Sequence, residues 1–421
     1  IPVVAFDGLD SIEQLQLFMD INENQKAVSA NLRLDLEEDL YWDSPVAASR
    51  LKALRSSIIK QIAYSQNGPL YNKISVGEER SILSFKPFST ALLKSGLLPI
   101  ARGNKYDESS VLSAMYDVNN HNHSKEMERC KKKVVQLVNL CYDFVEENYR
   151  DIFEREKYFI ISDRGTYAFI TLIGSLNTFL INKGELNRSS SPKERFELLE
   201  KYLDAVLHKI SILTKEDENK YLSLLGAGAD VKWLRLFQSI VNDKYSSYNP
   251  EDLVDWRERQ DEELQDNGRR FGESIETHMK HVILDTLQVS YGKDWEMEIA
   301  PIKRECEKRA SEEQEKNYKD GLGNEKIEWT TKFTIMDYKK IIEQHWSKPH
   351  REDGDVFKYF QEVFAIDVGL GFNSKTEKTK WIAQFNKYRN LWAHKGTKEK
   401  GLNKDEVEFL RKIYNFFNLD G

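Results

Sequence analysis

Apolar residues recur every three or four positions along most of this chain, which is the spacing of a helix with one buried face. Strand-like runs occur only in about the first hundred residues, starting with the apolar run at 1–6. We therefore expect an α+β protein that is predominantly α, with a mixed N-terminal part and an all-helical C-terminal part. The pattern predicts helices at residues 11–22, 44–66, 124–153, 191–213, 229–245, 275–291, 295–318, 335–346, 357–364, 376–394 and 404–417.

The best domain boundary lies at residues 246–270, where Ser-Ser-Tyr-Asn-Pro precedes a run of mixed charge. A chain of 421 residues has room for two or three domains of ordinary size. We predict a first domain at 1–250, a linker at 251–270 and a helical domain at 271–421. Within the first domain, the apolar stretch at 158–180 fits either one buried helix or a helix with a strand before it.

Composition excludes several classes of protein. Hydrophobic residues make up 40% and charged residues 31% of the chain, so it has enough apolar material for folded cores. No apolar run approaches the roughly 18 residues of a membrane span. The three cysteines are too few and too scattered for a disulfide framework or a zinc site, which favours a reducing, cytoplasmic compartment. A net charge of −7 argues against a broadly basic nucleic-acid-binding surface but leaves room for a local basic patch.

The start of the chain is unusual. It begins at Ile1 with an apolar run and has neither a methionine nor a signal peptide there. A strand at the first residue normally needs a partner strand to pair its backbone groups. We therefore expect that Ile1 follows a cut within a longer protein.

The most informative motif lies at the end of the helix predicted at 376–394, where the sequence is Arg-Asn-Leu-Trp-Ala-His. Asn390 and His394 are four residues apart and share one face of the helix, and the long side chain of Arg389 can reach the same cleft. Four aromatic residues at helical spacing predict that another face of this helix is buried in a core. They are Trp381, Phe385, Tyr388 and Trp392.

These three polar side chains are of the types needed for RNA cleavage without a metal or a cofactor. His394 would take or return a proton near neutral pH. Arg389 would hold the scissile phosphate and stabilise the transition state, and Asn390 would orient either group. The nucleophile would be the 2′-hydroxyl of RNA, so DNA would be inert. The alternative is structural, because a histidine near a helix C-terminus interacts favourably with the helix dipole and a neighbouring arginine is a common surface residue.

The pattern Arg-Asn-x-x-x-His at the end of a long helix, after aromatic residues and before one last helix, resembles the HEPN superfamily. The matching residues are Arg389, Asn390 and His394, and the resemblance covers residues 271–421. It implies an all-α bundle that forms a homodimer, with the motifs of two subunits meeting in one cleft. Many members of the superfamily are ribonucleases and others use the domain only for dimerisation, so the resemblance implies one of these two roles.

A second resemblance concerns the N-terminal part, where Ile-Pro-Val-Val, a helix and Phe-x-x-Ile-Asn-x-x-Gln-x-x-Val follow one another. This order is similar to the later half of the DGQHR domain of DndB-like proteins, a family of DNA-modification and phage-defence loci that is similar to ParB-like α/β folds. It implies a nucleotide- or nucleic-acid-binding site that includes Asn22, Gln25 and Arg33. The Asp-Gly-Gln-His-Arg motif is absent and would precede Ile1, so the chain holds at most half of that site. Without the resemblance, the asparagines fit a helix end followed by a turn.

Other polar clusters fit structural roles better than functional ones. His121 and His123 have no carboxylate or cysteine at ligand spacing and fit a surface loop rather than a metal site. The basic run at 125–133 contains glutamates and fits a solvated helix face better than a phosphate-binding site. Gly-Ala-Gly at 226–228 lacks the Lys-Ser/Thr of a phosphate-binding loop and indicates a helix break.

Two functional hypotheses follow from the sequence. The first is a bacterial defence or DNA-modification-associated protein whose N-terminal part senses nucleic acid or a nucleotide and whose C-terminal part cleaves RNA. The second is a non-catalytic DNA-binding or regulatory protein whose C-terminal domain only mediates dimerisation. Both hypotheses place a homodimer in the cytoplasm, with no membrane partner, no metal and no cofactor.

Overall fold

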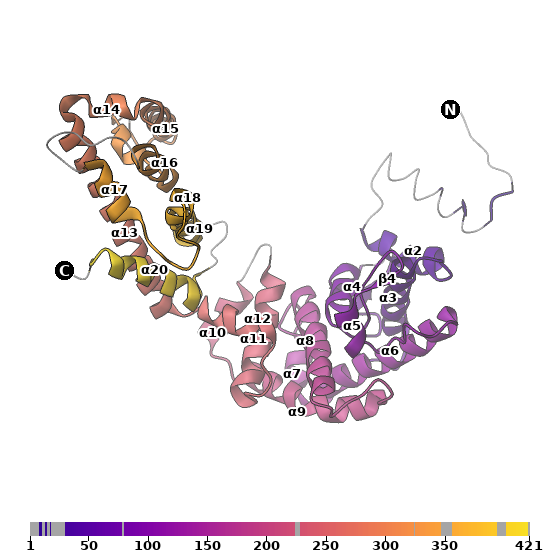
Figure 1. Cartoon of the computed structure of the whole chain (residues 1–421). Helices are drawn as coiled ribbons and strands as arrows, with labels where there is room; N and C mark the ends of the chain where they lie inside the picture. The colour runs from indigo at the N-terminus through magenta and orange to yellow at the C-terminus, as the bar shows by residue number, and fades with distance from the viewer. Residues whose placement is uncertain are drawn as a thin grey trace. The chain divides into compact units, whose positions relative to one another are not determined.

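The computed structural model describes residues 8–10, 13, 14, 17, 30–77, 80–223, 228–323, 325–346, 356–393 and 401–419. Over these residues the chain is predominantly helical, as its apolar periodicity predicts (Figure 1). The chain divides into two compact units, Ile1–Leu253 and Val254–Gly421. The strand predicted at 1–6 and most of the helix predicted at 11–22 lie outside the described residues.

The first unit is a set of packed helices with two very short sheets. Strands β1 (Ile74–Ser75) and β2 (Leu83–Ser84) pair in parallel, and β3 (Ala101–Arg102) and β4 (Lys105–Tyr106) form an antiparallel hairpin. The helices are α2 (Ala30–Tyr41), α3 (Ala47–Tyr64), α4 (Phe85–Lys94), α5 (Glu108–Ser113), α6 (His123–Asn148), α7 (Arg150–Phe153), α8 (Asp163–Asn182), α9 (Pro192–Ser211), α10 (Lys215–Leu222), α11 (Ala229–Lys244) and α12 (Glu251–Glu258), the last of which crosses into the second unit.

Helix α8 is the central element of the first unit and packs against α4, α9 and α11. It starts at Asp163 with Ser162 as its N-cap, whose Oγ accepts a hydrogen bond of 3.0 Å from the Gly165 amide. The apolar stretch at 158–180 therefore contains one buried helix, and the residues before it form no strand. Gly174 lets α8 approach the end of α4, since a Cβ atom at this position would lie 2.0 Å from the carbonyl oxygen of Ser95.

This close approach makes a prediction for the stability of the first unit. We expect Gly174→Ala to lower the free energy of unfolding by about 3 kcal/mol or more, because the added methyl group meets backbone rather than a movable side chain. Gly184→Ala is the matched control, since its Cβ would meet no atom within 4 Å and only its positive φ of 75° opposes the change. The control should cost about 1 kcal/mol. Equal losses for the two variants in urea denaturation would contradict this account of α8 packing.

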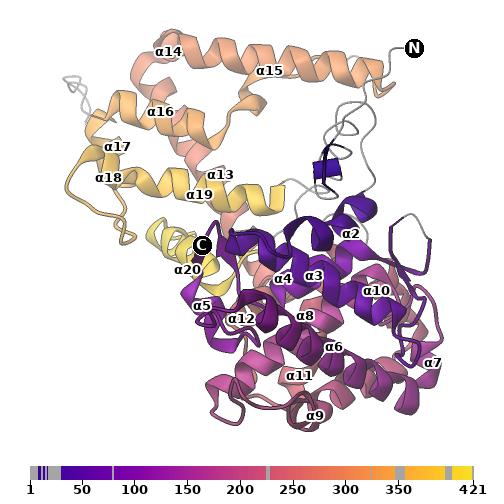
Figure 2. The ribbon, with the colours of Figure 1, turned by 90° about the vertical axis from the view of Figure 1, so that its right-hand side faces the viewer.

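The second unit contains helices and no strands over the residues that are described. Its core lies between helices that are far apart in sequence, and α13, α16 and α19 pack against one another (Figure 2). Its elements are α13 (Glu262–Tyr291), the 3₁₀ helix η1 (Gly292–Asp294), α14 (Trp295–Glu298), α15 (Ala300–Lys319), the 3₁₀ helix η2 (Trp329–Lys332), α16 (Ile335–His345), α17 (Val356–Phe364), α18 (Lys375–Lys378), α19 (Lys380–Ala393) and α20 (Lys404–Phe416).

Residues 251–270, which the sequence predicts as a linker, are mostly helical and belong largely to the second unit. Arg259 donates hydrogen bonds to the carboxylate of Glu406 at 2.8 Å and to the carbonyl oxygen of Gly401 at 2.6 Å. Gln265 donates to the carbonyl oxygen of Leu402 at 2.8 Å and accepts from its amide at 2.6 Å. Polar side chains of this segment therefore bind it to residues 401–406, where α20 begins.

Candidate functional site

The aromatic stripe of α19 faces the core of the second unit, as the sequence predicts. Trp381 and Phe385 are fully buried, and Tyr388 and Trp392 are half-buried against the same core. The indole Nε1 of Trp381 donates a hydrogen bond of 3.0 Å to the carbonyl oxygen of Phe364, which satisfies its polar atom inside the core. Burial of this stripe fixes the rotation of α19 about its axis, and so fixes where Arg389 and Asn390 point.

Helix α19 also makes a very close contact with α13. A Cβ atom at Gly272 would lie 2.2 Å from the ring of Trp392, so only glycine leaves room for the indole there. Glu276 and Arg389 also meet. Glu276 lies four residues after Gly272 on α13, whereas Arg389 lies three residues before Trp392 on α19. The contacts therefore run in opposite directions along the two helices, and α13 and α19 are antiparallel at this point.

Arg389 is held by the carboxylate of Glu276. Its Nε donates to Glu276 Oε2 at 3.1 Å and its Nη2 donates to Oε1 at 3.2 Å, which is a two-pronged arrangement. The side chains are 33% and 29% exposed, so the pair is partly shielded from water but open on one side. Both bonds use one edge of the guanidinium group, and among the described residues no bond is formed by Nη1. An anion could therefore bind Arg389 without displacing Glu276.

Tyr338 of α16 lies close enough to this pair to interact with it electrostatically. Burial raises the pKa of its phenol, the Glu276 carboxylate raises it further and Arg389 lowers it. The ring is 3% exposed and stacks on Phe333 at 5.4 Å between centroids. The phenol therefore stays neutral, and three helices contribute to the surroundings of Arg389.

Of the other residues in the predicted motifs, the structure describes the side chain of Asn390 and the backbone of Arg33. Asn390 lies on the exposed side of α19, next to Arg389. His394 follows the last residue of α19 and lies outside the described residues, as do Asn22 and Gln25. Arg33 lies in α2, and its side chain is not among those described. The described part of the structure places Glu276, which the sequence did not indicate, against Arg389.

Glu276 is the residue that sequence reasoning missed at this site. It lies on the same face of α13 as Gly272, Met279 and Ile283, at spacings of four, three and seven residues. Those three neighbours are buried, so Glu276 places a charge on an otherwise buried stripe. A carboxylate in such a position needs a partner, which is the one signal in the sequence that could have singled it out.

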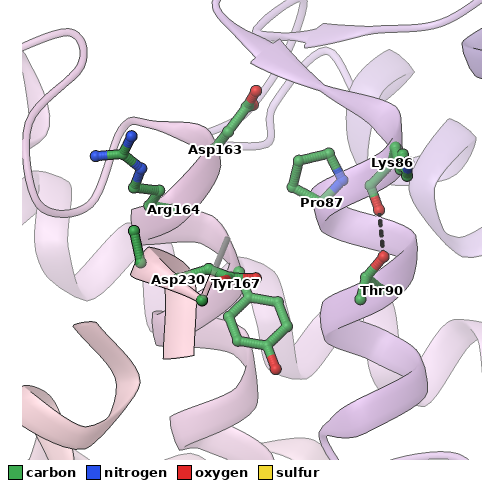
Figure 3. A pocket seen from close by; sticks show the side chains of 9 residues that line it. Lys86, Pro87, Thr90, Asp163, Arg164, Tyr167 and Asp230 are labelled. Atoms are coloured by element: carbon green, nitrogen blue, oxygen red, sulfur yellow. Dashed lines mark hydrogen bonds between the residues drawn. The ribbon is translucent and has the colours of Figure 1, made fainter. Parts of the chain in front are cut away.

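The first unit contains a cavity of about 370 Å³ where the N-terminal ends of α4, α8 and α11 come close together. Figure 3 shows Lys86, Pro87 and Thr90 on one side and Arg164 and Tyr167 on the other. Asp163 accepts hydrogen bonds from the amide and the hydroxyl of Ser84, at 2.7 and 2.8 Å, and so joins the start of α8 to the start of α4. The lining is Lys86, Pro87, Thr90, Asp163, Arg164, Tyr167, Gly228, Ala229 and Asp230.

The other polar clusters take structural positions where they are described. Glutamates pair with the basic run at the start of α6, where Arg129 contacts Glu126 and Lys131 contacts Glu128 at 2.6 Å. Gly228 has a φ of 92° and forms the N-cap of α11, which fits the predicted helix break. Within the described ranges, no group of three or more His, Cys, Asp or Glu side chains is arranged to hold a metal ion. No described helix is both long enough and apolar enough to cross a membrane.

Comparisons with models of protein families, with curated proteins and with solved structures found no match to this chain. The resemblances to the HEPN superfamily and to the DGQHR domain therefore rest on the sequence motifs given above. The contacts of Arg389 with Glu276 and of Trp392 with Gly272 do not depend on these resemblances, because they are observed between side chains and backbone in the structure.

The pairing of Arg389 with Glu276 makes a prediction for stability. A double-mutant cycle with Arg389→Gln and Glu276→Gln should give a coupling free energy of about 1 kcal/mol, because the pair is partly shielded and doubly bonded. The matched control is Arg411 and Glu408 on α20, which are both 49% exposed and joined by one bond. That pair should couple by only about 0.3 kcal/mol. If both cycles in thermal or urea denaturation give the same small value, Glu276 does not hold Arg389 in solution.

Proposed function

We propose that the second unit is a HEPN-like endoribonuclease that cleaves RNA without a metal ion, in a bacterial defence or DNA-modification-associated protein of the cytoplasm. The observation that supports the proposal most is the pair of hydrogen bonds that Arg389 donates to the Glu276 carboxylate. An arginine that binds a phosphate must be held in place while part of its guanidinium group stays available. Among the described residues, Glu276 occupies Nε and Nη2 of Arg389 and no residue bonds Nη1.

The proposed reaction is transesterification within the RNA. The 2′-oxygen attacks the adjacent phosphorus, the bond from phosphorus to the 5′-oxygen breaks, and a 2′,3′-cyclic phosphate and a 5′-hydroxyl end result. His394 moves the proton from the 2′-hydroxyl or to the leaving 5′-oxygen. Arg389 holds the phosphate and stabilises the extra negative charge of the transition state, and Asn390 orients these groups. Two such sites would face each other in a homodimer.

The first unit would supply the sensing part, as a partial DGQHR-like or ParB-like domain with a helical extension. We propose that it binds nucleic acid or a nucleotide. The support from the described residues is the cavity where α4, α8 and α11 start, in which Lys86 and Arg164 stand beside the carboxylates of Asp163 and Asp230. Asn22, Gln25 and Arg33 remain the residues that the family resemblance assigns to this role.

A second function is favoured by the same ion pair. Since Arg389 already has a carboxylate partner, its role could be to fix α19 on α13 for dimerisation, in a non-catalytic DNA-binding or regulatory protein. This alternative expects a dimer that binds DNA and leaves RNA intact. The two functions differ in one outcome, which is whether His394 and Arg389 are needed for RNA cleavage.

The test is RNA cleavage by the full chain with EDTA present, using tRNA and total RNA, with and without added DNA duplex and nucleotides. We expect cleavage by the wild type and a loss of at least about 100-fold in rate for Arg389→Ala and His394→Ala. Lys387→Ala on α19 and His281→Ala on α13 are matched controls, since both side chains are exposed and outside the proposed site. They should cleave like the wild type.

Equal behaviour of the wild type and His394→Ala under all of these conditions would overturn the ribonuclease proposal. A dimer in analytical ultracentrifugation that binds DNA and cleaves no RNA would support the alternative.

A further inference from the structure

The first unit contains a second cavity, larger and more polar than the one in Figure 3. It has a volume of about 570 Å³ and lies between the end of α4, α5, α8, α11 and residues 247–251. Hydroxyl and amide groups dominate its lining, which includes Ser113, Thr171, Ser175, Thr178, Gln238 and Tyr248. This is unusual because α8 and α11 otherwise meet through apolar side chains of the main core.

Three of these hydroxyl groups form a stripe on α8. Thr171, Ser175 and Thr178 are separated by four and three residues, so they lie on one face of the helix and all line the cavity. Thr178 donates a hydrogen bond of 3.0 Å to the carbonyl oxygen of Gly174, which leaves its oxygen able to accept. A buried helix that keeps a polar stripe toward a cavity offers hydrogen bonds there instead of apolar contact.

A network of hydrogen bonds fixes part of this lining in place. Arg235 donates to Gln238 Oε1 at 2.8 Å, and Gln238 Nε2 donates to Ser175 Oγ at 3.4 Å. Ser175 Oγ in turn shares a hydrogen bond of 2.8 Å with the hydroxyl of Tyr248. Arg235 is anchored at its other end by Asp252 at 2.8 Å. The hydroxyl groups are thus oriented before any ligand arrives, which reduces the entropy lost on binding.

Thr171 supplies an independent indication of a ligand. It is 6% exposed, and its Oγ1 is buried without a hydrogen-bond partner among the described residues. A buried hydroxyl with no partner costs stability, and valine would fill the same space without that cost. A ligand that carries hydroxyl groups would satisfy it.

The charges around the cavity define the class of ligand. Its charged residues, Lys94 and Glu251, have opposite signs and are exposed, whereas the buried groups of the lining are neutral. Arg235 contacts the lining through Gln238, but its charge is already paired with Asp252 at 2.8 Å, so a phosphate or carboxylate inside the cavity would have to compete with that pair.

The ring of Phe179 is half-buried, in edge contact with Tyr248 at 5.4 Å and approached by Lys183 Nζ at 5.2 Å, and it is an apolar part of the lining beside the hydroxyl groups. Sugars combine rows of hydroxyl groups with apolar C–H faces in the same way.

We propose that this cavity binds an uncharged sugar ring, either as a free sugar or as the ribose of a nucleoside. Thr171, Ser175 and Thr178 bond to its hydroxyl groups, and Phe179 packs against its apolar face. The proposal goes beyond the function proposed above and does not depend on RNA cleavage, because it concerns a different unit of the chain and a different kind of ligand.

Binding is tested on the full chain by saturation-transfer NMR and calorimetry with D-ribose, D-glucose, adenosine and cytidine, and with AMP and glucose 6-phosphate as charged counterparts. We expect at least one uncharged compound to bind with a Kd below about 10 mM, and its charged counterpart to bind more weakly. Binding by free sugars identifies a sugar site, and binding by the nucleosides alone identifies a nucleoside site. No binding by any of the four uncharged compounds, or tighter binding of a charged counterpart, would overturn the proposal.

Substitutions in the lining connect that binding to the cavity. Thr171→Val should lose about tenfold in affinity and keep or raise the melting temperature, because the removed hydroxyl has no partner in the free protein. Ser175→Ala should also lose affinity. Thr166→Val is the matched control, since Thr166 is buried on α8 and does not line the cavity, so it should bind like the wild type. Unchanged affinity in both Thr171→Val and Ser175→Ala would show that the ligand binds elsewhere.

Discussion

The close contact between α13 and α19 is the constraint from which the organisation of the second unit follows. Gly272 leaves the space that the ring of Trp392 fills, and this contact places Glu276 opposite Arg389. Packing dominates the energetics, because burial of large aromatic side chains contributes several kcal/mol whereas a half-exposed ion pair contributes about 1 kcal/mol. The ion pair therefore orients a side chain on a helix that is already fixed by its aromatic stripe.

Because aromatic packing fixes α19, the ion pair with Glu276 is needed only to orient Arg389, and this contact can therefore serve a chemical role. Among the described residues, the guanidinium group is held by Glu276 through one edge, and the Arg389 side chain stays 33% exposed. If Arg389 were more deeply buried, it could not reach a phosphate, and if it were free, it would have to be ordered on binding. The proposed ribonuclease needs an Arg389 that is both oriented and partly exposed. In the non-catalytic alternative, the same ion pair only holds α13 and α19 together.

The sequence predicts the parts of the structure that depend on local order. Helical spacing located α8, α9 and α19, and the aromatic stripe of α19 is buried as predicted. Ser191 and Pro192 mark the start of α9, where Ser191 and Glu194 form a capping box. Helix α10 is not predicted, because it is short, charged and has few apolar positions. The segment at 100–124, for which the apolar pattern predicts no helix, contains the β3–β4 hairpin and α5, which are equally short.

What the sequence cannot predict are the pairings between distant segments. Glu276 and Arg389 are 113 residues apart, and nothing local connects them. The two cavities described above are likewise formed by helices that are far apart in sequence and that the fold brings together. The Arg-Asn-x-x-x-His motif therefore yields a hypothesis about chemistry, and the structure adds the neighbour of Arg389 that no local pattern indicates.

The central claim is that the second unit cleaves RNA through the 2′-hydroxyl, and the most direct test lies in the substrate. An RNA oligonucleotide that the full chain cleaves at one position is resynthesised with a single 2′-deoxynucleotide on the 5′ side of that bond, and both are incubated with EDTA. The account predicts that this one change abolishes cleavage at the bond and that the products of the unmodified RNA carry a 2′,3′-cyclic phosphate in mass spectra. Cleavage of the deoxy-substituted bond at the same rate, or products with a 5′-phosphate, would contradict it.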